Sequence, residues 1–506
     1  MFDRIKITSI LAGTISLILV IIFPISTGLA ENNDALTVGI NADMRTPELL
    51  TTMDQTTDRI LLFHVYEPLI ARDRKMVAEP WLAEALEPLD RITWKLTLRK
   101  GIKFHNGKEL TADDVKYTLD WILNPKNASM RLARIELLEK VEQIGKYELK
   151  LITKKPFPVL PVSLGNISIV PKGMTPKKLA KNPIGTGPYK LENWKKEREI
   201  ILTKFDGYWG NMPYFKRLRF LIRPEMGARL SALLAGEVDM IPDVPVEMVQ
   251  SVIDNPATDI RTVPAGRIIG LYFNLVGDPD SVFHDIRMRK AFNYAINVRE
   301  ITDNILGGFA TPTGPLVPMN RHHYPEHGAY PYDPEKAVEL IKRAGYKPEE
   351  LHFTLHSPKG RYLKDFEAAQ AIGIQLGKIG IKVDVVADEW GHHLKLMKTC
   401  NKELSIYING RGERTFEGSM MAHWYRSGMP WHCFSDEEVD RAIDKAMPIV
   451  DPEEREKAMI QLEGLIWDKA PWVFLWAQDS VWGVKSDINW TPWADELPRL
   501  ANASRK

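Results

Sequence analysis

Histidine is the residue type in this chain whose spacing first suggests chemistry, because imidazole nitrogens are common metal ligands. His352 and His356 stand in the stretch HFTLH, and doublets occur at His322-His323 and His392-His393. HFTLH alternates as a strand does, which places its two histidines on one face but about 13 Å apart, too far for one ion. Adjacent residues point in divergent directions in a helix or a strand. We therefore expect packing or surface histidines, with no metal site and no cofactor.

The stretch NPIGTGPYKL (182–191) has the glycine density of a phosphate-binding loop. A phosphate loop leads into a helix, whereas Gly185-Thr186-Gly187 is followed by a proline and the strand-like YKLENW. We expect a turn in which the glycines allow close backbone approach and Pro183 and Pro188 fix the chain direction. The sequence also lacks GxSxG, HExxH and GxxxxGK[ST], and offers no nucleophile paired with a base. We therefore expect a protein that is not an enzyme.

The composition is that of a folded globular protein with more than one hydrophobic core. The chain has 506 residues, of which 44% are hydrophobic and 26% are charged, and this length predicts two or three compact lobes. Lysines and arginines number 67 against 66 aspartates and glutamates, a formal charge of +1. Because no basic excess is available to hold a phosphate backbone, we expect no nucleic-acid partner.

The first thirty residues have the order of a secretory signal. A basic start is followed by an uncharged stretch over residues 7–30 that ends in Gly28-Leu29-Ala30, a small-x-small cleavage site. The alternative is an uncleaved membrane anchor, since about 20 apolar residues can span a bilayer. Pro24 interrupts the apolar run and favours cleavage after Ala30. We expect an exported protein, free in the periplasm, because no cysteine for lipid attachment ends the run.

Cys400 and Cys433 are the two cysteines of the chain. In an oxidising compartment an even pair can form one disulfide. Two separate buried thiols are the alternative, because sequence separation says nothing about the Cβ distance. Neither cysteine has CxxC spacing, so the sequence supports no zinc or redox site.

Helix and strand patterns alternate along the chain without a repeat, which predicts an α/β architecture with more than one sheet. Residues 35–40 and 94–104 alternate as strands do, and Asn106-Gly107 predicts a tight turn behind the second. Thr111 is expected to cap a helix over 111–123. Further helices are expected at 226–236, 285–305, 333–344, 362–379, 435–446 and 452–469, the last opened by Asp451-Pro452.

Six blocks occur in an order that resembles the family 5 extracellular solute-binding proteins of ABC transporters, the dipeptide and oligopeptide-binding class. They are the block from AEPWLAEAL to YTLDWIL (78–123), NPIGTGPYKLENW (182–194), FDGYWG (205–210), IRMRKAFNYAINVREI (286–301), YPYDPEKAVELIKRAGY (330–346) and ADEWGHHLKLMK (387–398). The resemblance covers nearly the whole mature chain. It implies a fold like that of type II periplasmic binding proteins, with two α/β lobes joined by a hinge and an extra N-terminal domain.

The resemblance also implies a domain division and a role. Residues 1–30 are then the signal peptide, 72–184 the extra domain, 268–467 the second lobe, and 31–71, 185–267 and 468–506 a discontinuous first lobe, with NPIGTGPY as the crossover between the extra domain and the first lobe. The protein is expected to be a monomeric component of an ABC importer that captures peptides or peptide-like, amino-acid-derived solutes and delivers them to a permease in the inner membrane. A non-peptide cargo on the same fold is the alternative: an opine, an oligosaccharide, nickel or haem.

Site residues follow from the same resemblance. In dipeptide-binding relatives an arginine after a strand of the second lobe takes the ligand's carboxylate, and LHSPKGRYLKDF places Arg361 at the matching point. Arginine suits this role because its planar fork binds a carboxylate through two hydrogen bonds. The alternative is a surface arginine that leads the helix at 362–379. Trp390 and Trp424 are expected near the cleft, where their flat faces can cover a ligand.

The acidic segment with which these relatives pair a ligand amine has no clear counterpart here. The corresponding stretch INGRGERTFEGSMMAHWYRSG (408–428) lacks the Gly-Asp-Pro-Asp pattern and offers Glu413 or Glu417 beside Arg411 and Arg414. The added positive charge would disfavour a free amine. We therefore expect Arg411, Arg414 and Glu417 to contact a modified peptide, an opine or another amino-acid-derived anion.

Overall fold

The computed structural model describes residues 34–315, 327–412, 421–429 and 432–506. The strands are β1 (Ala35–Ile40), β2 (Ile70–Arg72), β3 (Ala78–Pro80), β4 (Ala83–Pro88), β5 (Thr93–Leu98), β6 (Leu138–Gln143), β7 (Glu148–Thr153), β8 (Tyr189–Lys195), β9 (Glu199–Lys204), β10 (Arg217–Ile222), β11 (Met240–Pro242), β12 (Thr258–Phe273), β13 (Ala310–Pro312), β14 (His352–Pro358), β15 (Lys382–Asp388), β16 (Ile406–Gly412), β17 (Trp472–Lys485), β18 (Ile488–Asn489) and β19 (Ser504–Arg505). The helices are α1 (Gln55–Leu61), α2 (Ala112–Leu123), α3 (Leu132–Ile135), α4 (Leu160–Leu164), α5 (Pro176–Lys181), α6 (Met226–Leu234), α7 (Val246–Ile253), α8 (Ile286–Ala295), α9 (Val298–Asn304), α10 (Pro334–Arg343), α11 (Asp365–Lys378), α12 (Trp390–Lys398), α14 (Glu437–Ala446) and α15 (Pro452–Lys469).

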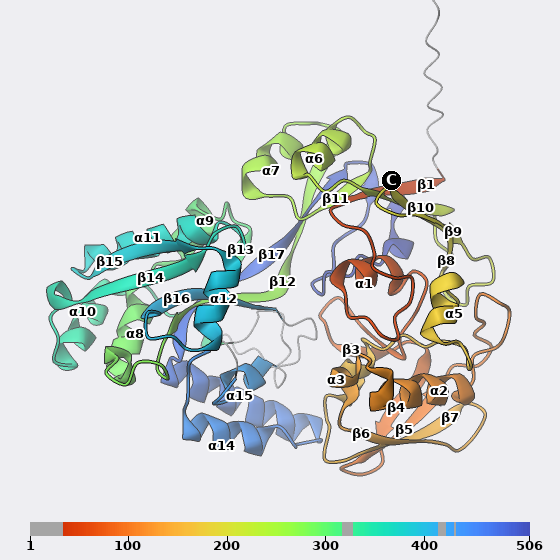
Figure 1. The fold of residues 1–506 in the computed structure, drawn as a ribbon, viewed down its shortest axis with the longest axis horizontal. Helices are drawn as coiled ribbons and strands as arrows, with labels where there is room; N and C mark the ends of the chain where they lie inside the picture. Colours follow the sequence, from red (N-terminus) through yellow and green to blue (C-terminus); the bar gives the residue numbers. More distant parts are fainter. Residues whose placement is uncertain (1–33, 316–326, 413–420, 430–431) are drawn as a thin grey trace, which may run out of the picture. The chain divides into compact units, whose positions relative to one another are not determined.

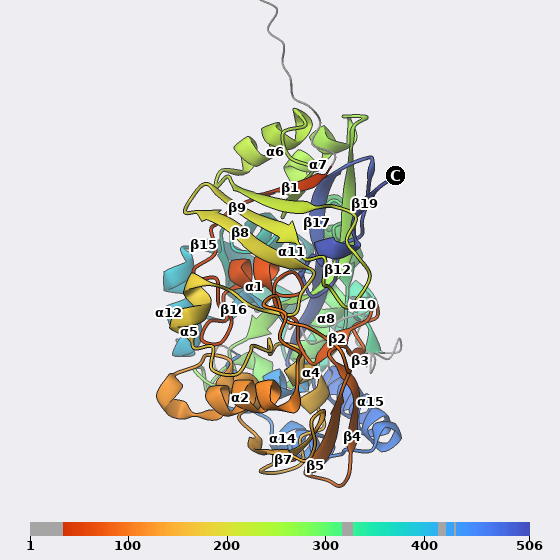
Figure 2. The same cartoon turned by 90° about the vertical axis from the view of Figure 1, so that its right-hand side faces the viewer.

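A mixed sheet forms the framework of the described residues (Figure 1). Its order is β15-β14-β16-β12-β17-β11-β1-β10-β9-β8, with β13 paired to β17. A separate antiparallel sheet, β4-β5-β7-β6, lies beside α2 (Figure 2). The α/β class expected from the alternating pattern is therefore confirmed, with more than one sheet.

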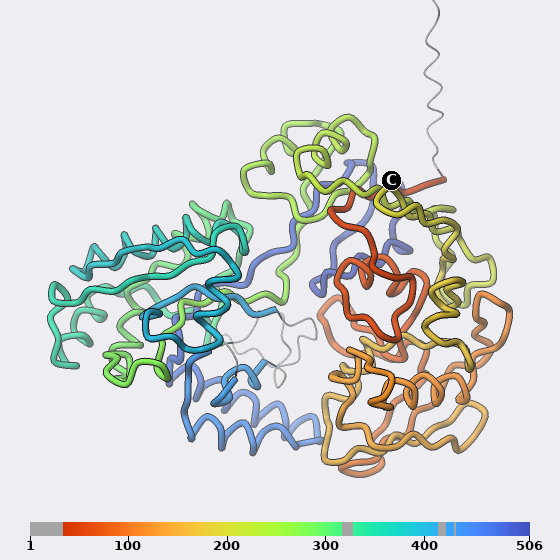
Figure 3. The backbone as a smooth tube through the Cα atoms, in the orientation of Figure 1, coloured from red at the N-terminus to blue at the C-terminus, as the bar shows by residue number. Residues whose placement is uncertain are grey.

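The two longest strands, β12 and β17, pair antiparallel along most of their length (Figure 3). Buried apolar side chains form two large clusters, and β17 supplies residues to both of them. Trp476 packs in the cluster that includes Leu355 of β14, whereas Trp482 packs in the cluster that includes Val38 of β1. Because one strand is anchored in both cores, β17 connects them mechanically.

Most of the expected helices are present. In α2 the Thr111 backbone N–H donates to Asp114 Oδ2 at 3.0 Å, which completes the capping box at the expected start. The single helix expected over 285–305 is wrong: α8 ends at Ala295 and α9 begins at Val298. Asn297 leaves the helical path and accepts a hydrogen bond from the Glu300 N–H at 3.1 Å, so it caps a new helix.

The strand expected over 94–104 is shorter than the alternation indicated. β5 ends at Leu98, and the chain turns at Gly101, whose φ is 78°. The tight turn at Asn106-Gly107 is confirmed, since Gly107 has φ 82° and its N–H donates to the Phe104 carbonyl at 2.9 Å. No described helix has both the length and the apolar character needed to span a bilayer.

The turn NPIGTGPY is a site of close backbone packing, as expected. A Cβ on Gly185 would lie 2.0 Å from the Val65 carbonyl oxygen, and one on Gly187 would lie 2.4 Å from the His64 carbonyl oxygen. Only glycine fits where two backbones approach this closely. Strand β8 follows the turn and begins at Tyr189, so no helix N-terminus faces the glycines as a phosphate site requires.

Glu67 is a buried carboxylate at which three of the quoted sequence blocks meet. Its Oε1 accepts hydrogen bonds from Trp81 Nε1 at 2.9 Å and from the Tyr208 hydroxyl at 2.8 Å. Its Oε2 accepts from the Thr186 hydroxyl at 2.8 Å and from Trp209 Nε1 at 2.9 Å. The aromatic and turn residues of these blocks therefore pack together around one buried carboxylate.

Candidate ligand-binding site

Three parallel strands end at one edge of the large sheet. β14 pairs in parallel with both β15 and β16, so Pro358, Asp388 and Gly412 share that edge. In open α/β sheets ligands bind outside the carboxyl ends of the strands. The segment after β14 carries Arg361, and α12 after β15 begins with Trp390. The topology therefore gathers these two expected site residues at this edge.

Arg361 stacks on Trp390. Its guanidinium carbon lies 4.9 Å from the Trp390 ring centroid and 5.6 Å from that of Tyr362. Asp365, at the start of α11, ties the loop to the helix: its carboxylate accepts hydrogen bonds from the backbone N–H groups of residues 360–362 at 2.8–2.9 Å. Helix α11 consequently begins at Asp365, not at 362 as expected. Arg361 is exposed, and within the described residues its guanidinium has no ion pair.

The buried histidine His393 holds Trp390 in place. Its Nδ1 contacts Asp388 Oδ2 at 2.7 Å and its Nε2 contacts the Ile408 carbonyl at 2.9 Å, which ties α12 to β15 and β16. His356 also contacts Asp388, at 3.1 Å. These histidines pack the fold, as expected. No group of three potential metal ligands occurs in the part of the chain that the structure describes.

Tyr362 and an arginine that the sequence analysis missed lie on the same face of β16. A Cβ on Gly410 would lie 2.7 Å from the Tyr362 ring, and a Cβ on Gly412 would lie 3.6 Å from Arg267 Nη2. Residues two apart on a strand share one face. Arg267 lies on β12 directly opposite Gly412. Its contact with the site depends on this strand register, for which the sequence carried no local signal.

Arg411 points to the opposite face of β16, because it lies between these two glycines. Its Nε donates to His432 Nε2 at 2.5 Å, and His432 Nδ1 contacts the Trp424 carbonyl. The structure therefore joins Arg411 to Trp424 through His432, and separates both from the face that carries Arg361. Arg414, Glu413 and Glu417 lie outside the described residues.

His432 has the protonation state that this arrangement requires. Burial and the neighbouring Arg411 lower the pKa of His432 to about 3. The ring is therefore neutral near pH 7, with Nδ1–H donating to Trp424 and the Nε2 lone pair accepting from Arg411. Tyr272 packs over the same ring, 5.6 Å between centroids.

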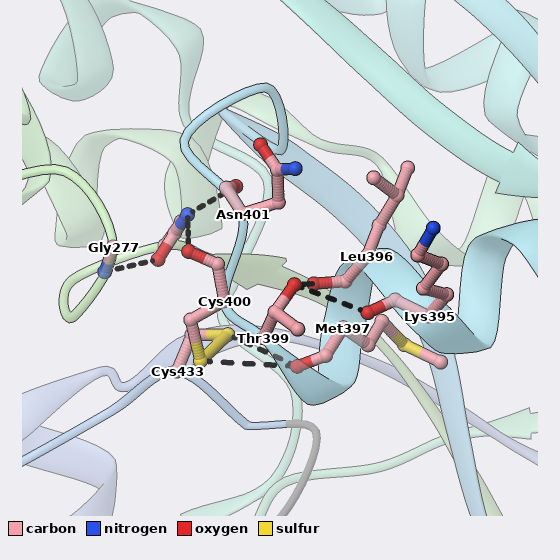
Figure 4. The surroundings of a disulfide bond; sticks show 9 residues. Gly277, Lys395, Leu396, Met397, Thr399, Cys400, Asn401 and Cys433 are labelled. Carbon is pink, nitrogen blue, oxygen red and sulfur yellow. Dashed lines mark hydrogen bonds between the residues drawn. A yellow bond between two sulfur atoms is a disulfide. The ribbon is translucent and has the colours of Figure 1, made fainter.

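A disulfide joins Cys400 to Cys433, with the two Cα atoms 5.5 Å apart (Figure 4). Asn274 Nδ2 donates to the carbonyls of Cys400 at 3.2 Å and Asn401 at 2.8 Å, and the Gly277 N–H donates to Asn274 Oδ1. The Cys433 carbonyl accepts from the Leu275 N–H at 2.9 Å. The disulfide and these hydrogen bonds thus hold Cys433, the residue after His432, against the loop 274–277 that follows β12.

Positive charge dominates the edge around Tyr362. Burial raises the pKa of the Tyr362 hydroxyl, while its hydrogen bond to Gly410 and the cations Arg361, Arg267 and Arg411 oppose that increase. Several guanidinium groups beside aromatic rings make a site that can hold a small organic anion. The fold and the site together define an α/β binding protein.

The comparison with protein families gives the group to which this chain belongs. Residues 77–431, more than half of the sequence, match the model for bacterial extracellular solute-binding proteins, family 5 middle. The chain therefore belongs to the family 5 bacterial extracellular solute-binding proteins, as its sequence blocks indicated.

Individual relatives cover nearly the full length of the chain. The glutathione-binding protein GsiB of Salmonella paratyphi A is 27% identical over 467 residues, 88% of this chain and 89% of GsiB. The ABC transporter substrate-binding protein CtaP of Listeria monocytogenes superposes with a TM-score of 0.83 at 23% identity, over 93% of this chain and 99% of CtaP. The periplasmic binding protein DppA of Helicobacter pylori, solved with the peptide STSA, has a TM-score of 0.71 at 23% identity, over 94% and 99% of the two chains. The two structures show a shared fold, that of the type II-like binding proteins.

Proposed function

We propose that this protein is the substrate-binding component of an ABC importer and that it captures a small peptide-like anion. The observation that carries this proposal is the stacking of Arg361 on Trp390 at the carboxyl edge of three parallel strands. A stacked guanidinium keeps its N–H edge available for a carboxylate. Family membership supports capture and release of a solute without catalysis.

Glutathione is the first cargo to test. GsiB is named for glutathione, and DppA of Helicobacter pylori was solved with a peptide. Glutathione is an amino-acid-derived anion with carboxylates that an arginine can bind through two hydrogen bonds. In this proposal Arg361 and Trp390 bind the ligand directly, and Arg414 and Glu417 belong to the adjoining segment that contacts the rest of the molecule. Arg411 and Trp424, joined through His432 on the other face of β16, support that segment.

The domain division expected from the sequence is part of the proposal. The four strands of the second sheet, residues 83–153, fall within the extra domain at 72–184. Strands β14, β15 and β16 fall within the second lobe at 268–467, and β1 and β8–β11 fall within the discontinuous first lobe. Strand β12 crosses the proposed boundary between residues 267 and 268, and β17, which pairs with β12, begins just after the boundary at 467; these two strands would form the hinge.

Export to the periplasm rests on residues 1–30. We expect cleavage after Ala30, so that a monomeric mature protein begins at Glu31 and meets its permease at the inner membrane. N-terminal sequencing of the protein from a periplasmic extract tests this. Recovery of a chain that begins at Met1 from the membrane fraction would contradict it.

Calorimetric titration tests the proposed cargo class. Mature protein should give saturable binding with reduced glutathione or with a short acidic peptide, and native mass spectrometry of protein from its host should show a co-purified anion of that class. Binding of nickel–histidine, haem or an oligosaccharide, with no binding of any peptide-like anion, would refute the proposal. Turnover of the bound solute would refute the non-catalytic role.

A further inference from the structure

Two indirect links through the sheet place Arg267 near the Arg361 loop. The first is on β16, where Arg267 Nη2 is 3.6 Å from the position of a Cβ on Gly412, and Tyr362 covers Gly410 on the same face. The second is on β17, where Gln478 is the register partner of Arg267. Gln478 Oε1 accepts a hydrogen bond from the Leu363 N–H at 3.3 Å. Arg267 and the loop 361–363 therefore lie at the same level of the sheet, at the position of Gln478 on β17.

Among the described residues the guanidinium of Arg267, which is partly buried, forms no hydrogen bond or ion pair. Its charge interacts with Asp243, on the segment after β11, from beyond ion-pair distance. The Asp243 carboxylate is itself bonded to Arg59 at 2.9 Å. Arg361 likewise lacks a carboxylate partner among the residues described. Two neighbouring guanidinium groups without carboxylate partners repel each other. Anionic groups that bind between or beside them offset this repulsion.

We propose that Arg267 and Arg361 are paired anion anchors, so that the cargo carries two carboxylates, one for each arginine. This inference rests on the proposed function and narrows its substrate class to peptide-like dicarboxylates. The charges of both arginines act on the Tyr362 hydroxyl, so the two guanidinium groups lie around one residue of the site. A short peptide with a carboxylate at each end has the matching chemistry.

The two glycines are part of this site. A side chain at residue 412 would occupy the surface on which the Arg267 guanidinium lies, and one at residue 410 would collide with Tyr362. The flat strand surface lets Arg267 reach the carboxyl edge while Tyr362 supports Arg361. Within the described residues neither guanidinium forms a hydrogen bond or an ion pair, so replacing Arg267 or Arg361 removes no polar contact; Arg361 loses only its stacking on Trp390 and Tyr362.

Calorimetric titration of wild type, Arg267→Gln, Arg267→Lys and Arg361→Gln tests the pairing. The probes are reduced glutathione, its glycyl monoethyl ester, an acidic tripeptide with two carboxylates, and the same tripeptide as its C-terminal amide. Wild type should bind the dicarboxylates at least 10-fold more tightly than the corresponding ester or amide. Arg267→Gln should bind the dicarboxylates about 30-fold or more weakly, because a charge-assisted pair is lost. Arg267→Lys should restore part of the affinity.

Comparing how each glutamine variant binds a dicarboxylate and its ester or amide shows which arginine binds which carboxylate. One of the two glutamine variants should no longer distinguish dicarboxylate from ester or amide, because the anchor for the modified carboxylate is already missing. Arg261→Gln is the matched control: this arginine lies on the same strand β12 and pairs with Asp259 at 2.8 Å, and it should leave binding unchanged. Melting curves check that all variants fold.

Each result decides between the two proposals. If wild type binds dicarboxylates and Arg267→Gln binds them as tightly, the pairing is wrong and the proposed function stands. If wild type prefers the ester or the amide, the dicarboxylate class is wrong. If wild type binds none of the probes and no other peptide-like anion, the proposed function is wrong. The proposal that Arg267 and Arg361 are paired anchors is then wrong as well.

Discussion

A guanidinium that stacks on an indole contacts it with its flat face, so its N–H groups remain available for hydrogen bonds to a carboxylate. Arg361 is in this position over Trp390, which is itself fixed because His393 ties α12 to the sheet. Arg411 is used differently, since its Nε is bonded to the neutral ring of His432. At the residue scale, therefore, Arg361 is the arginine on which binding should depend most.

Replacement of Arg361 should weaken binding strongly. Loss of a charge-assisted pair to a buried carboxylate costs on the order of 2–5 kcal/mol, so Arg361→Ala should bind the native cargo about 30-fold or more weakly. Arg361→Lys keeps the charge but loses the planar fork, and should recover only part of that loss. Titration calorimetry measures both. Arg343→Ala is the control, because its exposed pair with Glu339 is worth less than about 1 kcal/mol. Normal affinity in a folded Arg361→Ala protein would shift the role to Arg411 or Arg414.

Glu67→Gln should destabilise the fold. Each carboxylate oxygen of Glu67 accepts from one indole N–H, those of Trp81 and Trp209, so either orientation of a glutamine amide would turn its NH₂ group toward an indole donor. An unsatisfied buried donor costs about 1–3 kcal/mol. Urea unfolding should show the loss, with the exposed Glu84→Gln as the control.

The surroundings of Glu67 oppose each other in their effect on its ionisation. Burial raises the pKa of Glu67, against the effect of its four hydrogen-bond donors. A Glu67→Gln variant as stable as wild type would contradict the arrangement in which each carboxyl oxygen accepts a hydrogen bond from an indole.

The sequence could predict a residue of the site only where its neighbours along the chain define the position. Arg361 follows a strand and precedes a helix, so pattern and resemblance both locate it. Arg267 sits within a long strand, and its place in the site depends on the pairing of β12 with β16 opposite Gly412. Register between distant strands is not encoded in a local pattern, and this is why Arg267 was missed.

At the scale of elements, local sequence signals predicted where a helix begins better than they predicted whether a helix or strand continues. Asp451 accepts hydrogen bonds from two backbone N–H groups at the start of α15, as the Asp-Pro pair indicated. The break between α8 and α9 was missed because the apolar spacing continues through Asn297. The long strands β12 and β17 were also missed, since a strand buried on both faces lacks the alternation that marks a half-exposed one.

The disulfide should stabilise the segment that follows β16. The Cα separation of 5.5 Å is within the usual range for a disulfide, and closing a loop of this length contributes about 2–4 kcal/mol. Reduction, or Cys400→Ser with Cys433→Ser, should therefore lower the melting temperature. Thiol titration with Ellman's reagent in denaturant measures the bond directly, with reduced protein as the control. Two reactive thiols in the unreduced, exported protein would contradict it.

At the scale of the whole molecule, β17 connects the two large apolar clusters, and its residue Gln478 lies opposite Arg267 of β12. Asp479 is the next residue on this strand. Its Oδ1 is buried without a hydrogen-bond partner within the described residues, and burial raises the pKa of this carboxyl group to about 6. A charged Asp479 therefore opposes folding of the strand on which both clusters depend.

The pH dependence of stability should show this cost. Because the folded pKa exceeds the ordinary value of 3.8, the contribution of Asp479 is fully present below about pH 4 and is lost as the pH rises through about 6, by up to about 3 kcal/mol. Asp479→Asn removes the charge, so it should melt above wild type at pH 7–8 and close to it at pH 4. Thermal melts from pH 4 to 8 measure this, with the exposed Asp280→Asn as the control. A difference between Asp479→Asn and wild type that stays constant across this range would show that the buried charge is not its cause.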